Sequence, residues 1–424
     1  MMRILHVAPR YWPAVGGAES HIRELSQRLA AEGHAVTVVT TTAQSLDAFW
    51  SRQGQTASPA TAKHADVQIV RFPVRHFPMP GIAFPAGRLL IWLLSRFHTR
   101  INWLHRLAAF TPWTPQLHEW LESTDEAFDL VGAFSIVFEG LCNGALQYAK
   151  RRHLPFVLTP FTHLGAGSKP GSDRPSRVYT MRHQLDIARH SSALIAMTPT
   201  ERDYYTTHGV DDNRIHVIGS GVTPTQLLGG DEQAFRCQFG IETPIVAYLN
   251  ALAYDKGAIT TIEALRRLWD QGYAVSLVMA GSMMADVRRY LAALPRTVRE
   301  RVNVLGSIDE QTKRNLLAAS SMLVNPSRID SFGIVFLEAW LYRKPVIGST
   351  AWGMADVVSE GVDGLLTPFG DAEALAAAIA RLLCDQDLSS RFGAAGETKV
   401  YTQHTWERKY AVLSQIYREL LASS

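Results

Sequence analysis

The sequence predicts an α/β protein built from two doubly wound domains in tandem. Short runs of β-branched and aliphatic residues alternate with helical stretches along most of the chain, which is typical of parallel sheets covered by helices. This alternation restarts after a stretch rich in glycine at residues 219–230. The chain has 424 residues, which is too long for one hydrophobic core.

The first domain is expected to span residues 1–222 and the second residues 223–404. The predicted strands of the first domain are residues 4–8, 35–41, 67–72, 130–133, 155–159, 193–197 and 215–218. Those of the second domain are residues 244–249, 275–279, 302–305, 322–324, 345–347 and 365–367. An amphipathic helix over about residues 405–424 is expected to join the first domain.

The composition excludes several classes of protein. The formal net charge is +3, with basic and acidic residues mixed along most of the chain, which argues against binding to nucleic acid. Cys142, Cys237 and Cys384 lie far apart, so neither a disulfide framework nor a zinc site is predicted. The sequence shows no signal-peptide pattern and no apolar run of membrane-spanning length, and we expect a cytoplasmic protein.

Residues 325–340 combine several features of a ligand site. An apolar strand precedes them, Ser331 is a suitable N-cap, and Gly333 leaves the backbone amides of the first helical turn open to a ligand. Such a helix start attracts phosphate, and Asp330 and Glu338 could flank the same ligand. The other interpretation is an ordinary helix with a solvated acidic residue at each end, and the spacing alone does not separate the two.

Two loops of the first domain follow predicted strands at the carboxyl edge of the sheet, where doubly wound folds bind ligands. Gly16 and Gly17 follow the first strand, although the pair taken alone favours a simple tight turn. His163 follows the strand at residues 155–159, a position suited to polar chemistry. A single histidine without other evidence is more often a structural residue.

The segment of about residues 82–110 interrupts the alternation with aromatic, aliphatic and basic side chains. One interpretation is a pair of amphipathic helices that lie on an anionic membrane surface. The other is a pair of helices that pack on the domain, and the sequence leaves both open.

Several motifs, which occur in order along nearly the whole chain, resemble those of the retaining glycosyltransferases of family 4. The segments that carry the resemblance are Gly16-Gly17-Ala18-Glu19, Gly33-His34, Gly221-Val222, Asp255-Lys256-Gly257, the acidic pair Asp330 and Glu338 at the spacing of a Glu-x7-Glu motif, and Gly361-Val362-Asp363-Gly364-Leu365-Leu366. The resemblance implies the GT-B fold, in which two Rossmann-like domains face each other across a cleft.

The resemblance also implies transfer of a sugar from a nucleoside diphosphate to a hydroxyl acceptor, with the anomeric configuration retained. The donor is expected to be UDP- or GDP-linked, and the acceptor a sugar or a lipid-linked molecule in cell-surface polysaccharide, glycolipid or other glycoconjugate synthesis. No cofactor and no metal are expected, because Lys256 and helix-start amides can neutralise the departing diphosphate. The aromatic and basic segment would place the protein at the inner face of the cell membrane.

By the same resemblance, most donor-binding residues fall in the second domain. Glu338 would accept hydrogen bonds from the ribose, and Lys256 would pair with the diphosphate and stabilise it as it departs. Asp330 would face hydroxyls of the donor sugar, together with Ser331, Phe332 and Gly333 at the helix start. The backbone near Gly306, Ser307 and Ile308 would receive the base.

The first domain would contribute two elements to the reaction. His163 would approach the donor sugar, and Gly16 and Gly17 would allow the backbone to close on the diphosphate. The resemblance thus assigns His163, Asp330 and Lys256 to catalysis.

Two positions depart from the family pattern. The family usually has an arginine shortly before the lysine, where this chain reads Asn250-Ala251-Leu252. Arg328 and Arg10 are candidates to supply the lost positive charge, and surface residues are the alternative for both. Asp330 is one methylene shorter than the usual glutamate, a change that can shift the donor sugar or select a different one.

Two competing functions follow from the sequence. The missing arginine suggests a catalytically impaired subunit that only binds a nucleotide sugar, although Lys256, Glu338 and His163 are retained. A nicotinamide-dependent dehydrogenase is the weaker alternative, since the chain lacks Gly-x-Gly-x-x-Gly and has Thr40-Thr41-Thr42 where an acidic residue is required.

Overall fold

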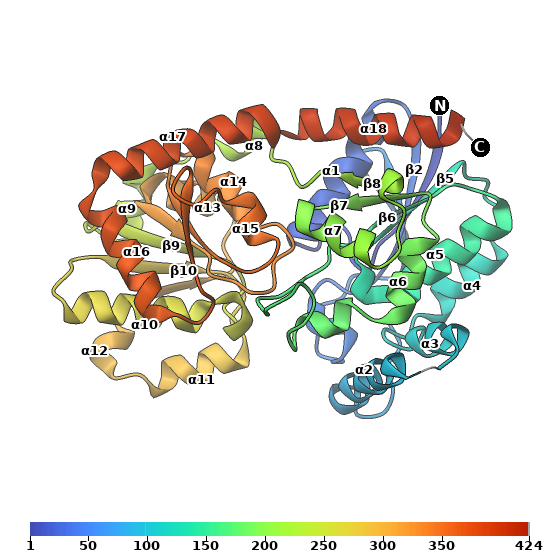
Figure 1. The fold of residues 1–424 in the computed structure, drawn as a ribbon, viewed down its shortest axis with the longest axis horizontal. Helices are drawn as coiled ribbons and strands as arrows, with labels where there is room; N and C mark the ends of the chain where they lie inside the picture. The colour runs from blue at the N-terminus through green and yellow to red at the C-terminus, as the bar shows by residue number, and fades with distance from the viewer. Residues whose placement is uncertain (98, 423–424) are drawn as a thin grey trace. The chain divides into compact units, whose positions relative to one another are not determined.

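The computed structural model describes residues 1–97 and 99–422, which form two compact units (Figure 1). Unit 1 consists of Met1–Thr162, Arg174–Gly219 and the chain from Tyr410 onward, and unit 2 of His163–Asp173 and Ser220–Lys409. Residue 98 of the predicted segment 82–110, and residues 423–424 of the predicted C-terminal helix, lie outside the described residues. The proposed domain boundary at residue 222 remains a prediction.

Unit 1 is built on an eight-stranded sheet in the order β3-β4-β2-β1-β5-β6-β7-β8. Every strand pair in it is parallel except β3 with β4. The strands are β1 (Arg3–Val7), β2 (Ala35–Thr41), β3 (Thr61–His64), β4 (Val67–Phe72), β5 (Leu130–Phe134), β6 (Phe156–Thr159), β7 (Ala193–Ala196) and β8 (Ile215–Val217). The seven strands predicted for the first half are all present.

The helices of unit 1 cover both faces of this sheet (Figure 1). They are α1 (Gly17–Ala31), α2 (Pro80–Arg96), α3 (Ile101–Ala108), α4 (Pro115–Ser123), α5 (Glu139–Arg152), α6 (Arg182–Arg189) and α7 (Pro199–Thr207), with 3-10 turns at Leu46–Phe49, Ile136–Phe138, Ser176–Tyr179 and Asp212–Arg214. Because β1 has β2 on one side and β5 on the other, the loop from β1 to α1 lies where the direction of winding changes.

Strand β3 was missing from the sequence prediction. It is a short edge strand with no fully buried residue, so its composition carries no alternation of apolar and polar side chains. Ala65 and Asp66 connect it to β4, and both have positive φ angles, of 45° and 62°. This is a tight hairpin turn formed without the Asn-Gly pair that usually marks one in a sequence.

The predicted aromatic and basic segment folds into α2 and α3, which a buried polar network ties to the rest of unit 1. Arg88 of α2 forms an ion pair with the buried carboxylate of Glu139 on α5. The ring of His183 and the amide of Gln184, both on α6, lie 3.2 Å from the same carboxylate. Burial raises the pKa of Glu139, but the Arg88 and His183 partners outweigh it, so that the pKa lies below its ordinary value.

Unit 2 contains a parallel six-stranded sheet in the order β11-β10-β9-β12-β13-β14, with helices on both faces (Figure 1). All six predicted strands are confirmed. They are β9 (Ile245–Leu249), β10 (Ser276–Ala280), β11 (Val302–Gly306), β12 (Met322–Val324), β13 (Val346–Ser349) and β14 (Gly364–Thr367). The helices are α8 (Pro224–Leu227), α9 (Glu232–Phe239), α10 (Ala258–Asp270), α11 (Ala285–Ala293), α12 (Arg296–Arg299), α13 (Glu310–Ala319), α14 (Ile334–Leu341), α15 (Met354–Val357), α16 (Ala372–Cys384) and α17 (Gln386–Gln403), with a 3-10 turn at Tyr254–Lys256.

The last described helix is α18 (Trp406–Ala422), and its part from Tyr410 onward belongs to unit 1. There Tyr417 is buried, and its hydroxyl lies 3.3 Å from Nε2 of His6 on β1. Among the described residues, none of the helices combines the length and apolar character that are needed to cross a bilayer.

Candidate active site

The candidate site of unit 2 lies at the carboxyl ends of β9 and β12. These neighbouring strands mark the switch point of the sheet, because β10 and β11 lie beyond β9 while β13 and β14 lie beyond β12. Asn250 directly follows β9 and Asn325 directly follows β12. Ligands of open α/β sheets bind at this point, since the loops diverge there and leave space.

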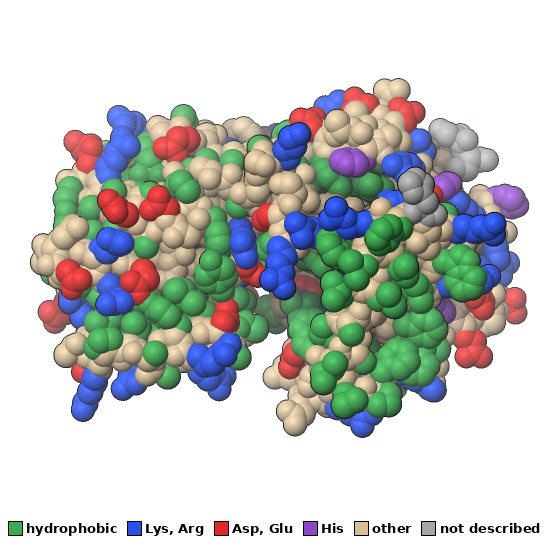
Figure 2. Space-filling model, turned by 60° about the horizontal axis from the view of Figure 1, so that its bottom comes forward, with side chains coloured by type: hydrophobic (Ala, Val, Ile, Leu, Met, Phe, Trp, Pro, Cys, Tyr) green, Lys and Arg blue, Asp and Glu red, His purple; other side chains and the backbone are tan. Residues whose placement is uncertain are grey.

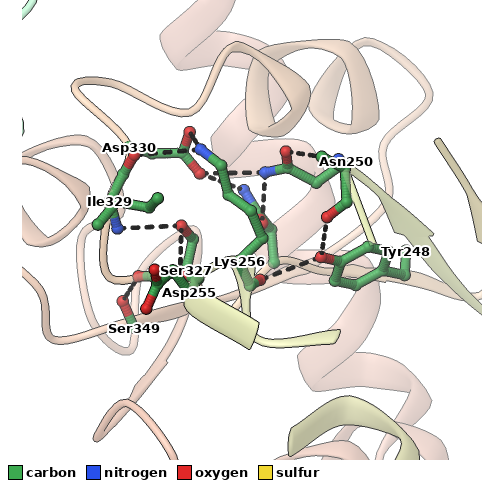
Figure 3. A network of polar contacts seen from close by, with 10 residues as sticks. Tyr248, Asn250, Asp255, Lys256, Ser327, Ile329, Asp330 and Ser349 are labelled. Atoms are coloured by element: carbon green, nitrogen blue, oxygen red, sulfur yellow. Dashed lines mark hydrogen bonds and ion pairs between the residues drawn. The ribbon is translucent and has the colours of Figure 1, made fainter. Parts of the chain in front are cut away.

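Lys256 and Asp330 form an ion pair at this switch point (Figure 3). Nζ of Lys256 donates to Oδ1 of Asp330 over 2.7 Å and to the backbone oxygen of Ile329 over 3.1 Å. The two side chains are only 16% and 18% exposed. Burial raises the pKa of the Asp330 carboxyl, but Lys256, His163 and Ser327 together outweigh it, and the pKa lies below its ordinary value.

Two asparagines hold the other oxygen of this carboxylate. Nδ2 of Asn250 lies 3.1 Å from Oδ2 of Asp330 (Figure 3). It also lies 3.1 Å from Oδ1 of Asn325, whose own amide nitrogen lies 3.4 Å from Oδ2 of Asp330. Neither asparagine was predicted from the sequence to contact Asp330. The available signal was an asparagine directly after each of two strands that end at the same edge of the sheet.

The two loops that carry this pair are tied together by backbone contacts. The Tyr248 hydroxyl donates to the backbone oxygens of Ala251 and Lys256, over 2.9 and 3.1 Å. Gly257, with φ of 80°, ends the turn that carries Lys256, and a Cβ there would lie 2.5 Å from the backbone oxygen of Pro326. Only glycine allows this approach, so the Lys-Gly pair predicted from the sequence has a steric cause.

His163 belongs to unit 2 by its contacts, although it follows β6 of unit 1 in the sequence. Burial and the positive charge of Lys256 lower its pKa to about 3, while Asp330 acts in the opposite direction. The structure therefore brings the three predicted catalytic residues into one electrostatic environment, in which His163 is neutral near pH 7.

The loop that carries His163 is fixed within unit 2 by Trp352. The backbone amide of Trp352 donates to the oxygen of Gly165 and its indole Nε1 donates to the oxygen of Gly167, each over 2.9 Å. Asp173 closes the loop by accepting from the amide of Ala166 over 2.9 Å. The loop thus keeps a defined shape next to the ion pair.

The helix after β12 begins later than predicted. Ser331 was expected as its N-cap, but Gly333 takes that position with a left-handed backbone (φ 83°, ψ 58°), and the helix starts at Ile334. A Cβ at Gly333 would lie 2.9 Å from the ring of Phe336, which explains why a glycine and not a serine ends this loop. The start of α14 is therefore bare backbone, a suitable surface for an anion. The predicted donor contacts of Ser331, Phe332 and Gly333 remain predictions.

Glu338 is buried on α14 and pairs with Lys313 of α13 over 2.9 Å. Glu310 binds the same ammonium group over 2.9 Å from a largely exposed side chain. Burial lowers the pKa of Lys313, but the two carboxylates outweigh it and raise the pKa above its ordinary value. The predicted ribose-binding carboxylate is thus held in place by a charged partner.

The predicted base-binding backbone lies at the end of the edge strand β11. Gly306 ends this strand with φ of 70°, and there is open space where its Cβ would stand. Its oxygen accepts from the amide of Gly281 over 2.8 Å, while Ile308 is half-buried in the following loop. Contact of Gly306 and Ile308 with a base remains a prediction.

The two arginines considered as replacements for the lost charge already have acidic partners. Arg328 binds Oδ1 of Asp255 through Nε and Nη2, over 2.8 and 2.5 Å. Its guanidinium also lies 5.5 Å from the ring centre of Tyr254 and 4.7 Å from that of Phe369. Arg10 lies in unit 1 and pairs with Glu19 over 2.6 Å. Part of each positive charge is therefore already balanced.

Gly16 and Gly17 lie in unit 1, where Gly17 begins α1. A Cβ at Gly16 would lie 2.2 Å from Oε2 of Glu19, so a larger residue there would displace the Glu19 carboxylate from its present position. Their contact with a diphosphate remains a prediction. Among residues 1–97 and 99–422, no group of three or more His, Cys, Asp or Glu side chains is arranged to hold a metal ion.

Two family models match the chain. The model described as glycosyl transferases group 1 matches residues 231–399, and the model described as a glycosyl transferase 4-like domain matches residues 16–221. Among characterised proteins, the chain is similar to glycogen synthase of Mycobacterium tuberculosis, with 26% identity over 98% of this chain and 94% of that protein.

Solved structures share the fold over the whole length. Sucrose-phosphate synthase from Thermosynechococcus elongatus aligns with a TM-score of 0.74 and 21% identity, covering 100% of both chains. The HepE protein of Anabaena in complex with UDP-glucose aligns with a TM-score of 0.71 and 18% identity, covering 99% of this chain and 100% of that chain. The two sheets described above are therefore those of the GT-B fold.

Proposed function

The chain belongs to the group 1 glycosyltransferases, a retaining family that uses nucleotide sugars, and we propose that it transfers a hexose from a UDP- or GDP-linked donor to a hydroxyl acceptor in the synthesis of a cell-surface polysaccharide, glycolipid or other glycoconjugate. The donor binds to unit 2 at the carboxyl ends of β9 and β12. A UDP-linked sugar is favoured because the HepE structure of the same fold was solved with UDP-glucose.

The observation that carries this proposal is the largely buried pair of Lys256 and Asp330 beside the bare start of α14. In the donor complex, Lys256 and the first amides of α14 face the diphosphate, and Asp330 faces the sugar. Preorganised positive charge of this kind stabilises the diphosphate as it departs. Because His163 is neutral near pH 7, it contacts the sugar as a hydrogen-bonding group and not as a second cation.

The proposed reaction is a front-face substitution at the anomeric carbon. The bond from this carbon to the diphosphate oxygen breaks, the acceptor oxygen forms a bond on the same face, and the departing phosphate oxygen takes the acceptor proton. The protein supplies no obligatory nucleophile in this scheme. Glu338, fixed by Lys313, binds the ribose, and the backbone at Gly306 and Ile308 receives the base.

Donor hydrolysis by the Lys256→Ala variant tests the proposal. Purified protein is incubated with labelled UDP- and GDP-sugars without acceptor, and released sugar is measured. We expect slow hydrolysis of one donor by the wild type and at least a hundredfold loss in the variant, because the departing charge loses its partner. Lys399→Ala is the matched control, since Lys399 pairs with Asp363 over 2.8 Å in the same unit. Equal activity of Lys256→Ala and wild type would overturn the assigned role.

A subunit that binds a nucleotide sugar without turnover is the second candidate. Two observations favour it: Ala251 stands where the family usually has an arginine, and Asp255 already balances the nearby Arg328. The same incubation separates the two functions. A pure binder shows a ligand-induced rise in melting temperature but releases no sugar from any donor.

We further propose that unit 1 lies against an anionic membrane surface through α2 and α3, which places the enzyme at the inner face of the cell membrane. The sequence has no acidic residue between Asp66 and Glu119, a stretch that contains Arg71, Arg75, Arg88, Arg96, Arg100 and Arg106. Large apolar side chains are exposed on these helices and in the loops next to them, namely Phe77, Met79, Ile82, Leu89, Leu90, Leu93, Phe97, Trp103 and Phe110. Figure 2 shows these hydrophobic side chains gathered on one face of the unit with basic side chains near them. Such a surface suits insertion into anionic lipid.

A further inference from the structure

A cavity of about 210 Å³ lies in unit 1 between α2, α3 and the loops on either side of them. Most of its wall is aromatic or aliphatic, and the rings are those of Phe49, Phe77, Phe84, Phe110 and Trp113. None of the residues assigned to donor binding lines it. Its position on the segment that interrupts the βα alternation suggests a function separate from the donor site.

The size and lining of the cavity favour a hydrocarbon ligand. An apolar cavity of roughly 150 Å³ stays dry and takes up benzene, so this one has room for several carbon atoms of an alkyl chain. A sugar would need several polar partners, but most of the wall is apolar: its polar residues are Arg75, His76 and Thr111, and Nε2 of His76 is already bonded to the backbone oxygen of Ala48 over 2.9 Å. Aliphatic chains require no such partners.

The cavity is a built site with a fixed frame. The ring of Phe77 stacks on Trp113 with centroids 4.8 Å apart, and the amide of Arg75 donates to the oxygen of Trp113 over 2.8 Å. On the other side, α2 is held by the ion pair of Arg88 with Glu139 and by Ser95, whose hydroxyl accepts from the amide of Arg182 over 3.0 Å. The walls therefore do not depend on the ligand for their position.

One basic residue of the cavity wall and further basic residues on the neighbouring helices favour an anionic head group on the hydrocarbon. Arg75 is an exposed residue that lines the cavity, and Arg96 and Arg106 are exposed on α2 and α3. Arg177 lies with its guanidinium 5.4 Å from the ring centre of Trp92 on α2. Residues 67–118 include no acidic residue, so the charged side chains that this stretch of the chain could present to a phosphate at the mouth are all positive.

We infer that this cavity binds one hydrocarbon chain of a lipid acceptor that carries an anionic head group. The acceptor assignment rests on the proposed transferase function, whereas the binding of the chain does not. A lipid seated in this way keeps its tail in unit 1 and presents its polar end to solvent. The exposed apolar residues around the mouth would support this lipid within the membrane surface.

The test measures binding of a dansyl-labelled undecanoic acid to the full-length protein without vesicles. We expect saturable binding of one molecule, displaced by dodecyl phosphate but not by dodecyltrimethylammonium. Ala83→Trp fills the cavity and should weaken probe binding at least tenfold. Ala83→Leu fills it in part and should weaken binding less, and it keeps the test valid if the larger ring disturbs folding. Leu93→Ser is the control, because Leu93 is exposed on α2 and does not line the cavity. Unchanged binding in both Ala83 variants, or equal displacement by the cationic detergent, would overturn the inference.

Two parallel measurements separate the possible failures. Binding to vesicles of phosphatidylglycerol and phosphatidylcholine should fall in Leu93→Ser and stay near wild type in Ala83→Trp. Equal losses of vesicle and probe binding in Ala83→Trp would assign the cavity to a bilayer lipid and overturn the acceptor assignment. Donor hydrolysis is followed in the same samples. If the wild type binds the probe but hydrolyses no donor, the proposed transferase function is contradicted and the cavity site is not. If the wild type hydrolyses a donor but Ala83→Trp binds the probe as well as the wild type does, the cavity site is contradicted and the transferase function is not.

Discussion

The ammonium group of Lys256 lies 2.7 Å from one carboxylate oxygen of Asp330, and this pair joins the loops after the two central strands of unit 2. The other oxygen of Asp330 accepts from Asn250. Both oxygens thus have fixed partners, and the carboxylate is oriented before any donor arrives. In the proposed donor complex, the length of the side chain at residue 330 would set where the donor sugar meets it.

Lengthening this side chain should change the choice of sugar. We expect Asp330→Glu to alter the ratio of kcat/KM between two UDP-sugars by about tenfold or more, since one methylene in a pocket has an effect of that order. The measurement is kcat/KM for UDP-glucose, UDP-galactose and UDP-N-acetylglucosamine. Asp363→Glu is the control, because Asp363 forms a similar lysine pair, 2.8 Å long, with Lys399. Identical ratios in Asp330→Glu and wild type would contradict the role of Asp330.

Asn250 is predicted to act by positioning Asp330. Removing its amide in Asn250→Ala withdraws a hydrogen bond from a charged group, which typically costs about 1.5–3 kcal/mol, so kcat should fall about tenfold to hundredfold. The donor KM should change less than kcat. Asn303→Ala is matched to it, since the Asn303 amide donates to the oxygen of Leu277 within the same sheet. A loss of kcat shared by both variants would point to general destabilisation.

The sequence predicted the sheets of both units because their parallel strands are buried on both faces. β5 and β9, for example, are fully buried runs of mainly apolar residues. β3 lacks this signal, since it is an edge strand with an exposed face.

The site was predicted in part. Lys256, Asp330 and Glu338 were predicted because their types and spacing resemble a motif, and the structure pairs the first two, while their roles toward a donor stay predictions. Asn250 and Asn325 were not predicted, because they meet through a contact between loops 75 residues apart in the sequence. The N-cap was placed at Ser331 because serine is a good cap, but packing of Phe336 against Gly333 set the helix start instead. Contacts between distant segments decide such details, and local preference does not report them.

Glu338 should affect donor binding more than turnover. Glu338→Gln removes the charge that holds Lys313 and weakens hydrogen bonds to the ribose, so the donor Kd should rise about tenfold with little change in kcat. Calorimetric titration with UDP and the intact donor measures this. Glu310→Gln offers a close control, since Glu310 binds the same ammonium group from an exposed position. Equal affinities in the two variants would remove the ribose role.

His6 should make unit 1 less stable in acid. Burial lowers its pKa from 6.5 to about 3, so between these values the unfolded chain binds a proton that the folded chain does not. The free energy of unfolding therefore falls as the pH drops through this window, by up to about 1.4 kcal/mol per pH unit for one such group.

Denaturant unfolding of His6→Gln between pH 6 and 4 checks this dependence. The slope of unfolding free energy against pH should be smaller in the variant than in the wild type, whatever its absolute stability. His153→Asn, which removes an exposed histidine at the end of α5, is the control. A variant His6→Gln with the wild-type slope would show that His6 takes up its proton equally in both states.

Binding of the α2 and α3 surface to a membrane should depend on charge as well as on apolar area. Arg96 and Arg106 are exposed, and their guanidinium groups lie 5.3 and 5.6 Å from the ring centres of Trp92 and Trp103. Each basic residue near an anionic surface contributes about 1 kcal/mol, so reversing both to glutamate should weaken binding to phosphatidylglycerol vesicles at least about thirtyfold.

Cosedimentation at two salt concentrations measures this charge dependence. Screening shortens the range of the interaction, so wild-type binding should fall on going from 0.05 to 0.5 M salt while the double variant changes little. Reversal of Arg288 and Arg289, exposed on α11 of unit 2, is the matched change of charge at another surface. If that reversal weakened vesicle binding as much as the change on α2 and α3, net charge and not this surface would govern attraction to the membrane.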